Sequence, residues 1–426
     1  MTPTRAPVGG PTSRWRPTPT TAASRGAADR VRLAHAQVRG TVRLALAFVA
    51  AAAAVALIDG LTDGLTDGRW LALHLFLAGG VVLAISGVSV MLTVTWSAAP
   101  APPDPIVHLQ RWCVAAGAAG VAAGRQLDLG AWMLAPAGTA YLVGLLLLAG
   151  MLVVTARRGV ERRFDPAVAA YLAALVAGTA GVVLGVTMAL GTPTAGLRAA
   201  HVTLNLLGLI GLVVGGTLPF FAATVGRSRM APHATATRLF GAVGWQTAAV
   251  TTAVLGLVTG ADRVAAGGLA AYAVGIGAAL WLLPRPTRRQ LRWAGPRLVA
   301  LWAGGLWWAV AVAATSVEIA GGDGAVFGGR WLLVLAVGGY AQILWGSVAY
   351  LLPMLRGGGH EQLGRSFAAM RSWIGLAAAN LAAIALALDV HLLAAAGVGV
   401  WVLDTAVRTV RVGLGARAAP TRGEPA

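Results

Sequence analysis

Residues 131–155 read AWMLAPAGTAYLVGLLLLAGMLVVT and contain no charged side chain. A helix rises about 1.5 Å per residue, so roughly 20 apolar residues cross the hydrocarbon core of a bilayer. Two arginines, Arg157 and Arg158, follow this stretch almost at once. A long apolar run that ends in an arginine-rich loop indicates a transmembrane helix with a cytoplasmic C-terminal end.

The composition of the whole chain agrees with this stretch. Hydrophobic residues make up 57% of the 426 positions and charged residues only 11%, which is far below the charge content of a soluble domain. The net charge of +18 comes from arginine alone, because the sequence contains no lysine. These arginines lie in short loops without interleaved aromatic residues, so they indicate membrane topology and no nucleic-acid partner. Cys113 is the single cysteine, which excludes an intrachain disulfide and a cysteine-based metal cluster.

The same criterion predicts about twelve transmembrane helices and hence an all-α integral membrane bundle. The predicted spans are 41–59, 70–96, 108–125, 131–155, 166–191, 197–224, 238–260, 263–283, 297–318, 330–354, 368–388 and 391–411. The weakest are the third and the last, because Arg111 and Asp404 interrupt them.

Loop charges provide a test of this count. With the N-terminus inside, arginines concentrate in the even-numbered loops, whereas the odd-numbered loops carry aspartates. Only five arginines fall outside: Arg69, Arg125, Arg198, Arg263 and Arg330. A missed helix would invert the alternation beyond it, so the positive-inside rule supports twelve helices with both termini cytoplasmic. The arginine-only basic residues and the abundant alanine and glycine suggest a bacterial genome, so we expect a bacterial plasma membrane.

The chain divides into three predicted parts. Residues 1–40 form a basic tail that we expect to be disordered and not to be a cleavable signal, because they show no hydrophobic period. Residues 41–411 form the twelve-helix domain, and residues 412–426 form a cytoplasmic tail. No loop exceeds about twenty residues, so any chemistry must occur within the bundle or at its faces.

The second, sixth and tenth segments have a common pattern. Each begins at or just after an outer arginine and carries a glycine or serine pair past its middle. These pairs are Ser86-Gly87, Gly215-Gly216 and Gly346-Ser347. The pattern is compatible with three four-helix units around a pseudo-threefold axis, although long glycine-containing helices also look alike by chance.

Two histidines are candidate ligands for a cofactor. His74 and His201 each lie about one turn inside the outer end of their segment, so they can face one another if the second and sixth helices are neighbours. Neutral imidazole is a common ligand for haem iron and copper. Asn205 lies four residues after His201 on the same face and can orient its imidazole.

The intramembrane polar residues can also have structural roles instead of binding a cofactor. Each histidine can simply hydrogen-bond to a neighbouring helix and hold the bundle together. Asp404 and Arg408 are four residues apart and should neutralise one another, and Gln246 and Asn380 should bond between helices. The polar and aromatic residues of the tenth segment suit a cofactor or quinone pocket, but also ordinary packing. They are Tyr340, Gln342, Trp345 and Tyr350.

The stretch from His201 to Gly208, HVTLNLLG, with Gly215 and Leu218-Pro219 after it, resembles a pattern of haem-copper oxidase-like membrane subunits. It is more similar to the membrane portion of actinobacterial proteins labelled copper oxidases, in which the bundle precedes a copper-nitrite-reductase-like domain. The segments 71–96 and 339–353 resemble that family as well. The resemblance implies a twelve-helix, haem-copper-oxidase-like bundle with histidine ligands on the second, sixth, seventh and tenth helices.

Only His74 and His201 match those ligand positions, since neither the seventh nor the tenth segment contains a histidine. A complete oxygen or nitric oxide reductase is therefore not expected. The resemblance implies instead a degenerate relative that binds haem b or copper near the outer face, transfers electrons, and serves or anchors a periplasmic copper redox enzyme.

Two further functions stay open. A twelve-helix secondary transporter should carry an Asp-Arg glycine-rich motif between its second and third helices, but residues 97–105 read SAAPAPPDP. A cofactor-free assembly or structural protein would account for the scarcity of buried polar residues.

Overall fold

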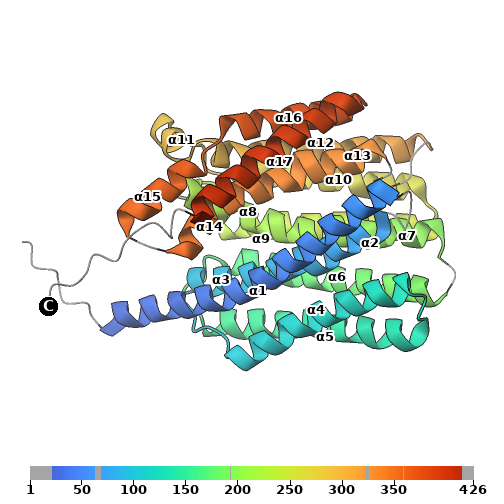
Figure 1. Ribbon diagram of the computed structural model, residues 1–426, viewed down its shortest axis with the longest axis horizontal. Coiled ribbons are helices and arrows are strands. Elements are labelled where there is room, and N and C mark those ends of the chain that lie inside the picture. The colour runs from blue at the N-terminus through green and yellow to red at the C-terminus, as the bar shows by residue number, and fades with distance from the viewer. Residues whose placement is uncertain are drawn as a thin grey trace, which may run out of the picture.

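The computed structural model describes residues 22–62, 69–191, 193–322, 326–327, 329–357 and 359–414. Within these ranges the regular structure is entirely helical. Long helices run side by side along one axis, as Figure 1 shows, and the short helices α11 and α15 lie at one end. The fold is an all-α integral membrane bundle, as the sequence predicts.

Besides the last helix, ten elements are continuous α-helices. They are α1 (Ala22–Thr62), α4 (Asp104–Gln126), α5 (Ala131–Arg158), α6 (Asp165–Leu190), α9 (Ala236–Thr259), α10 (Asp262–Trp281), α11 (Arg288–Ala294), α12 (Pro296–Ala320), α15 (His360–Ala369) and α16 (Trp373–Ala387). The last helix, α17 (His391–Leu414), continues slightly past the predicted end of the bundle, and the rest of the predicted C-terminal tail lies outside the described residues.

Three long rods are composite, because a π-helical segment separates two α-helical parts. They are α2 (Arg69–His74), η1 (Leu75–Val81) and α3 (Val82–Trp96); α7 (Ala195–Thr203), η2 (Leu204–Gly211) and α8 (Leu212–Gly226); and α13 (Arg330–Leu333), η3 (Val334–Ala341) and α14 (Gln342–Arg356). These rods are the second, sixth and tenth predicted spans.

Eleven helices of the described ranges are long and apolar enough to cross a membrane, and α4 is not among them. Hydrogen bonds nevertheless show that α4 begins at the end of the bundle at which α5 finishes. The carbonyl of Ser97, just before α4, accepts bonds from the amides of Val160 and Glu161, just after α5, at 2.9 and 3.1 Å. Both loops therefore lie at the same end, so α4 must lead away from that end and α5 must return to it.

The prediction of a disordered tail over residues 1–40 is wrong for its second half. The first helix begins at Ala22, well before Thr41. Ala34 and Val38 are almost fully buried four residues apart, and Gln37 donates to the carbonyl of Pro102 at 2.9 Å. Small side chains make this contact, and they leave no strong hydrophobic period in the sequence.

The three π segments give physical support to the four-helix period. Aligned at their first residues, they place two glycines eight positions apart in every rod. The pairs are Gly79 and Gly87, Gly208 and Gly216, and Gly338 and Gly346. A Cβ on any of these glycines would meet the helix that precedes its rod, namely α1, α6 or α12 respectively. The equivalent contacts recur because each rod packs on its predecessor in the same way.

Tyrosine hydroxyls bond to equivalent carbonyls of two π segments. The hydroxyl of Tyr141 on α5 donates to the carbonyl of Ala78, the fourth residue of η1, at 2.9 Å. The hydroxyl of Tyr272 on α10 donates to the carbonyl of Leu207, the fourth residue of η2, at 2.7 Å. A π segment disturbs the regular hydrogen-bond ladder, and these hydroxyls satisfy carbonyls that have no water available in the membrane.

We expect Tyr141→Phe and Tyr272→Phe to destabilise the bundle by similar amounts, about 1–3 kcal/mol each, because each change leaves a buried carbonyl unpaired. The two sites are separate, so the double variant should show the sum. Tyr350→Phe is the matched control, since its hydroxyl makes no hydrogen bond within the described part of the chain. Denaturant unfolding in detergent measures all four proteins, and equal stability of Tyr272→Phe and Tyr350→Phe would contradict the expectation.

Two of the three predicted polar contacts are confirmed. The side chain of Asn380 accepts a bond from Trp307 at 2.9 Å and donates to Gln342 at 3.2 Å. Arg408 pairs with Asp404 at 2.9 Å, as the spacing of four predicts. Gln246 is buried, but its amide nitrogen has no hydrogen-bond partner, so the predicted bond to another helix is not formed.

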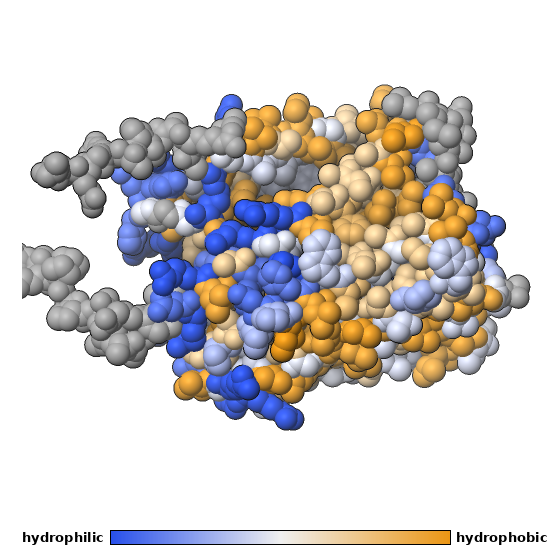
Figure 2. Space-filling model, turned by 60° about the horizontal axis from the view of Figure 1, so that its bottom comes forward, coloured by the Kyte–Doolittle hydropathy of each residue, from blue (hydrophilic) through white to orange (hydrophobic). Residues whose placement is uncertain are grey.

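The surface is divided along the long axis. Figure 2 shows hydrophilic residues gathered mainly at the left-hand end and a broad apolar band beyond them. We call this end, which contains Ser97, Arg227 and Arg371, the arginine end. The opposite end, where α2, α7 and α13 begin, is called the histidine end.

Candidate functional site

His74 is the last residue of α2 and directly precedes the π segment η1. Its ring stacks on that of Trp70, with centroids 4.0 Å apart and planes 25° apart. Its Nδ1 lies 2.8 Å from the carbonyl oxygen of Trp70, one helical turn earlier. The carbonyl and the indole together fix the orientation of this imidazole.

His201 lies on α7, close to the start of η2. Its Nδ1 lies 2.8 Å from the carbonyl oxygen of Gly181 on the neighbouring helix α6. A Cβ on Gly185, one turn further along α6, would lie 2.9 Å from Cε1 of the imidazole. The glycine therefore leaves the space in which the ring sits.

The structure confirms that the two histidines lie together. Their ring centroids are 6.4 Å apart and their planes differ by 16°. Two helices far apart in the sequence bring them to the same depth, as their matched distances from the helix starts predict. Both side chains are only partly buried, at the histidine end of the bundle.

The hydrogen bonds of His74 and His201 determine which nitrogen of each ring is available to bind a metal. A carbonyl oxygen only accepts, so each Nδ1 must carry the proton that it donates. In the neutral ring, Nε2 then keeps its lone pair. This arrangement, with Nδ1–H held by a carbonyl and Nε2 free, is the usual one for a histidine that binds a metal.

Asn205 lies beside His201, as predicted, but its main bond is to the backbone. Its Nδ2 donates to the carbonyl of His201 at 2.8 Å and lies 3.4 Å from Nδ1 of the ring. Since Nδ1 already donates to Gly181, that carbonyl orients the imidazole more directly than Asn205 does. The sequence gives no signal for Gly181 or Trp70 in this role, because both act through backbone oxygens.

The tenth rod has no comparable site. Two of its four candidate residues make structural hydrogen bonds: the hydroxyl of Tyr340 donates to the carbonyl of Leu206 at 2.7 Å, and Gln342 bonds with Asn380. Across the described ranges, no group of three or more His, Cys, Asp or Glu side chains is arranged to hold a metal ion. Within these ranges, His74 and His201 are the pair of candidate ligands that lie together at this site.

A groove of about 410 Å³ lies well away from the histidines. It follows α5 and the loop before α4 at the arginine end, and its lining includes Pro102, Ile106, Leu146 and Arg158. Ile106 and Leu146 are exposed apolar side chains, so this groove belongs to the lipid-facing surface.

No protein-family model matches the chain, and no curated protein matches it.

Proposed function

We propose that His74 and His201 together bind one redox-active metal, either the iron of haem b or a copper ion, through their Nε2 atoms. The observation that carries this proposal is the facing pair of imidazoles whose Nδ1–H groups are both held by backbone carbonyls. The protein would then be a degenerate haem-copper-oxidase-like membrane protein that transfers electrons.

The spacing of the rings supports a shared metal. A bond from a metal to an imidazole nitrogen is about 2 Å long, so two imidazoles on opposite sides of one ion have ring centres roughly 6 Å apart. The observed separation of 6.4 Å is close to that value.

The charge distribution supports an orientation of the protein in the membrane. Arginines favour the cytoplasmic side of a membrane, so the arginine end would face the cytoplasm of a bacterial cell and the histidine end the periplasm. A metal held near the outer face lies within reach of a soluble partner. We therefore propose a periplasmic copper redox protein as the partner.

The residues of the chain have distinct parts in this function. The carbonyls of Trp70 and Gly181 keep both imidazoles in the tautomer that binds a metal. Gly185 leaves room for the ring of His201, and Trp70 covers one face of His74. When bound, the metal would supply the one-electron chemistry.

The test is the metal content of the protein purified in detergent from a haem-replete, copper-supplemented bacterial host. Haem b predicts a Soret band, sharper α and β bands on reduction, and about one haem per chain. Copper predicts about one copper ion per chain by mass spectrometry and no Soret band. A preparation with neither would refute the proposal and favour the cofactor-free structural protein.

A further inference from the structure

Three arginines from separate segments meet at the arginine end, and we call them the arginine cluster. Arg227 follows α8, Arg297 lies in the first turn of α12, and Arg371 lies between α15 and α16. Arg227 and Arg371 are exposed, whereas Arg297 is only 3% exposed. The charges of Arg227 and Arg371 both repel that of Arg297.

Arg297 has aromatic neighbours but no carboxylate partner in the described part of the chain. Its guanidinium carbon lies 4.6 Å from the ring centre of Phe367, 5.1 Å from that of Trp293 and 5.9 Å from that of Tyr350. One nitrogen makes a long bond of 3.4 Å to the carbonyl of Trp293, and Nε has no hydrogen-bond partner. A buried guanidinium with an unused donor is costly unless an anion compensates it.

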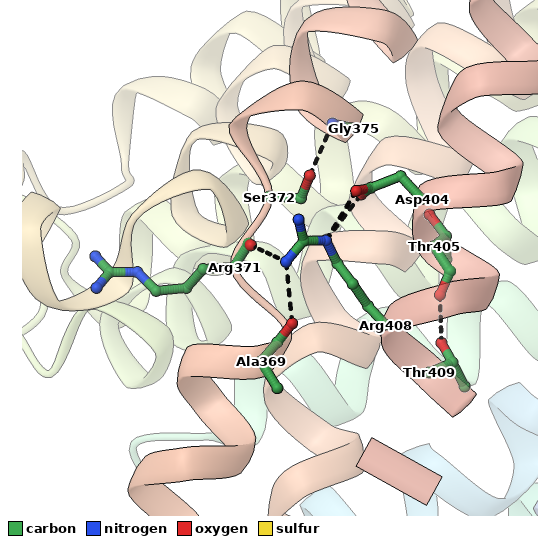
Figure 3. A network of polar contacts seen from close by, with 8 residues as sticks. All are labelled: Ala369, Arg371, Ser372, Gly375, Asp404, Thr405, Arg408 and Thr409. Atoms are coloured by element: carbon green, nitrogen blue, oxygen red, sulfur yellow. Dashed lines mark hydrogen bonds and ion pairs between the residues drawn. The ribbon is translucent and has the colours of Figure 1, made fainter. Parts of the chain in front are cut away.

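The acidic residue near the cluster is already engaged. Figure 3 shows Asp404 bound to Arg408, which also donates to the carbonyls of Ala369 and Arg371. The side chain of Arg371 points away from this network. Its guanidinium lies against Gly295, where a Cβ would be 3.0 Å from Nε. The guanidinium also donates one hydrogen bond to the carbonyl of Arg292. The network therefore fixes the backbone of Arg371, and its positive charge has no carboxylate partner among the described residues.

Further donors converge on the same place. The N-terminus of α12 has Pro296 in its first turn and no side-chain cap, so the helix dipole there favours an anion. Nε1 of Trp293 is buried without a hydrogen-bond partner. Arg227 lies over the ring of Trp293, with its guanidinium carbon 3.7 Å from the ring centre.

We propose that the arginine cluster binds the phosphate of an anionic phospholipid headgroup. Phosphate accepts several hydrogen bonds from guanidinium groups at once, which matches three arginines with unused donors. Trp373 and Ile374 are exposed apolar residues next to Arg371, and they offer a surface to the acyl chains. Basic sites between helices at the cytoplasmic side of a membrane commonly bind such headgroups.

The test compares two double variants of the full-length protein. Arg227→Gln with Arg371→Gln removes two exposed charges of the cluster, and Arg157→Gln with Arg288→Gln removes two exposed arginines elsewhere at the arginine end. Delipidated protein in detergent is titrated with cardiolipin, phosphatidylcholine or inorganic phosphate. Lipid binding is followed by native mass spectrometry and by the thermal midpoint.

We expect cardiolipin to bind and to raise the midpoint of the wild type and the control, and phosphatidylcholine to do neither. The cluster variant should bind cardiolipin roughly thirtyfold more weakly, since each basic residue contributes about a factor of five. Equal cardiolipin binding by both double variants would overturn the proposal. If inorganic phosphate raised the thermal midpoint as much as cardiolipin does, the proposal of a lipid ligand would be overturned. The cluster would then be a site for a soluble anion.

Discussion

Replacing His201 by alanine is expected to remove the bound metal completely and to leave the bundle folded. The change deletes one of two protein ligands, and a single imidazole does not hold the metal during purification. The ring of His201 is only partly buried, so its loss removes little apolar contact. The carbonyl of Gly181 loses its donor, but it lies near the histidine end, where water can replace the imidazole.

Metal content and the absorption spectrum measure this effect, and His74→Ala should give the same result. His108→Ala and His391→Ala are matched controls, because both side chains are exposed and neither contacts the histidine pair. Both controls should keep the full metal content. A His201→Ala protein that retains its haem or copper would show that the pair is structural.

A change at Gly185 tests whether metal binding requires the position of the His201 ring and not only its presence. A Cβ on Gly185 would lie 2.9 Å from Cε1 and 3.2 Å from Nδ1 of His201, so Gly185→Ala must move the imidazole. Disturbing the groups that orient a ligand typically lowers metal affinity about 10- to 100-fold. Gly150→Ala is the control, because no atom lies within 4 Å of its added methyl group. A structural histidine pair would show no spectral difference between the two variants.

The sequence predicts the helices well because two independent signals determine them. Apolar length locates each span, and the alternation of arginine between loops checks the count. Neither signal locates the start of α1. Residues 22–40 include several arginines, and their buried positions are small residues such as Ala34 and Val38. Burial of small side chains depends on the neighbouring loop before α4, which no local pattern reveals.

The site is partly predictable for similar reasons. Equal depth of His74 and His201 follows from the helical rise and from clear helix starts. The carbonyls that hold the imidazoles are not predictable, since every residue has one and only tertiary packing selects Gly181. The arginine cluster is also invisible in the sequence, because Arg227, Arg297 and Arg371 come from three separate segments.

The repeat predicts that alanine substitutions at its three equivalent glycines destabilise the bundle by different amounts. Gly346→Ala should be the most destabilising of the three equivalent changes, because its Cβ would lie 2.6 Å from the carbonyl oxygen of Arg297. That oxygen belongs to the backbone of α12, so the whole helix must shift. Gly216→Ala should be nearly as costly, with a Cβ 2.2 Å from that of Ala170. Overpacking of this kind costs about 1–3 kcal/mol.

Gly87→Ala should be the mildest of the three. Its nearest neighbours are Cγ2 of Val38 at 3.0 Å and Cβ of Thr41 at 3.2 Å, both of which belong to side chains on α1. Gly241→Ala is the control within a spanning helix, because nothing lies within 4 Å of the added atom. There alanine should be neutral or stabilising, since it favours the helix over glycine by about 1 kcal/mol.

Denaturant unfolding of the four variants in one detergent gives the ranking. The expected order of stability is Gly241→Ala, then Gly87→Ala, then Gly216→Ala and Gly346→Ala. This order depends on the three rods packing on their preceding helices as the structure has them. If Gly346→Ala and Gly241→Ala were equally stable, α14 would not lie against α12 at this distance. The equivalence of the three rods, on which the four-helix period depends, would then fail at its third member.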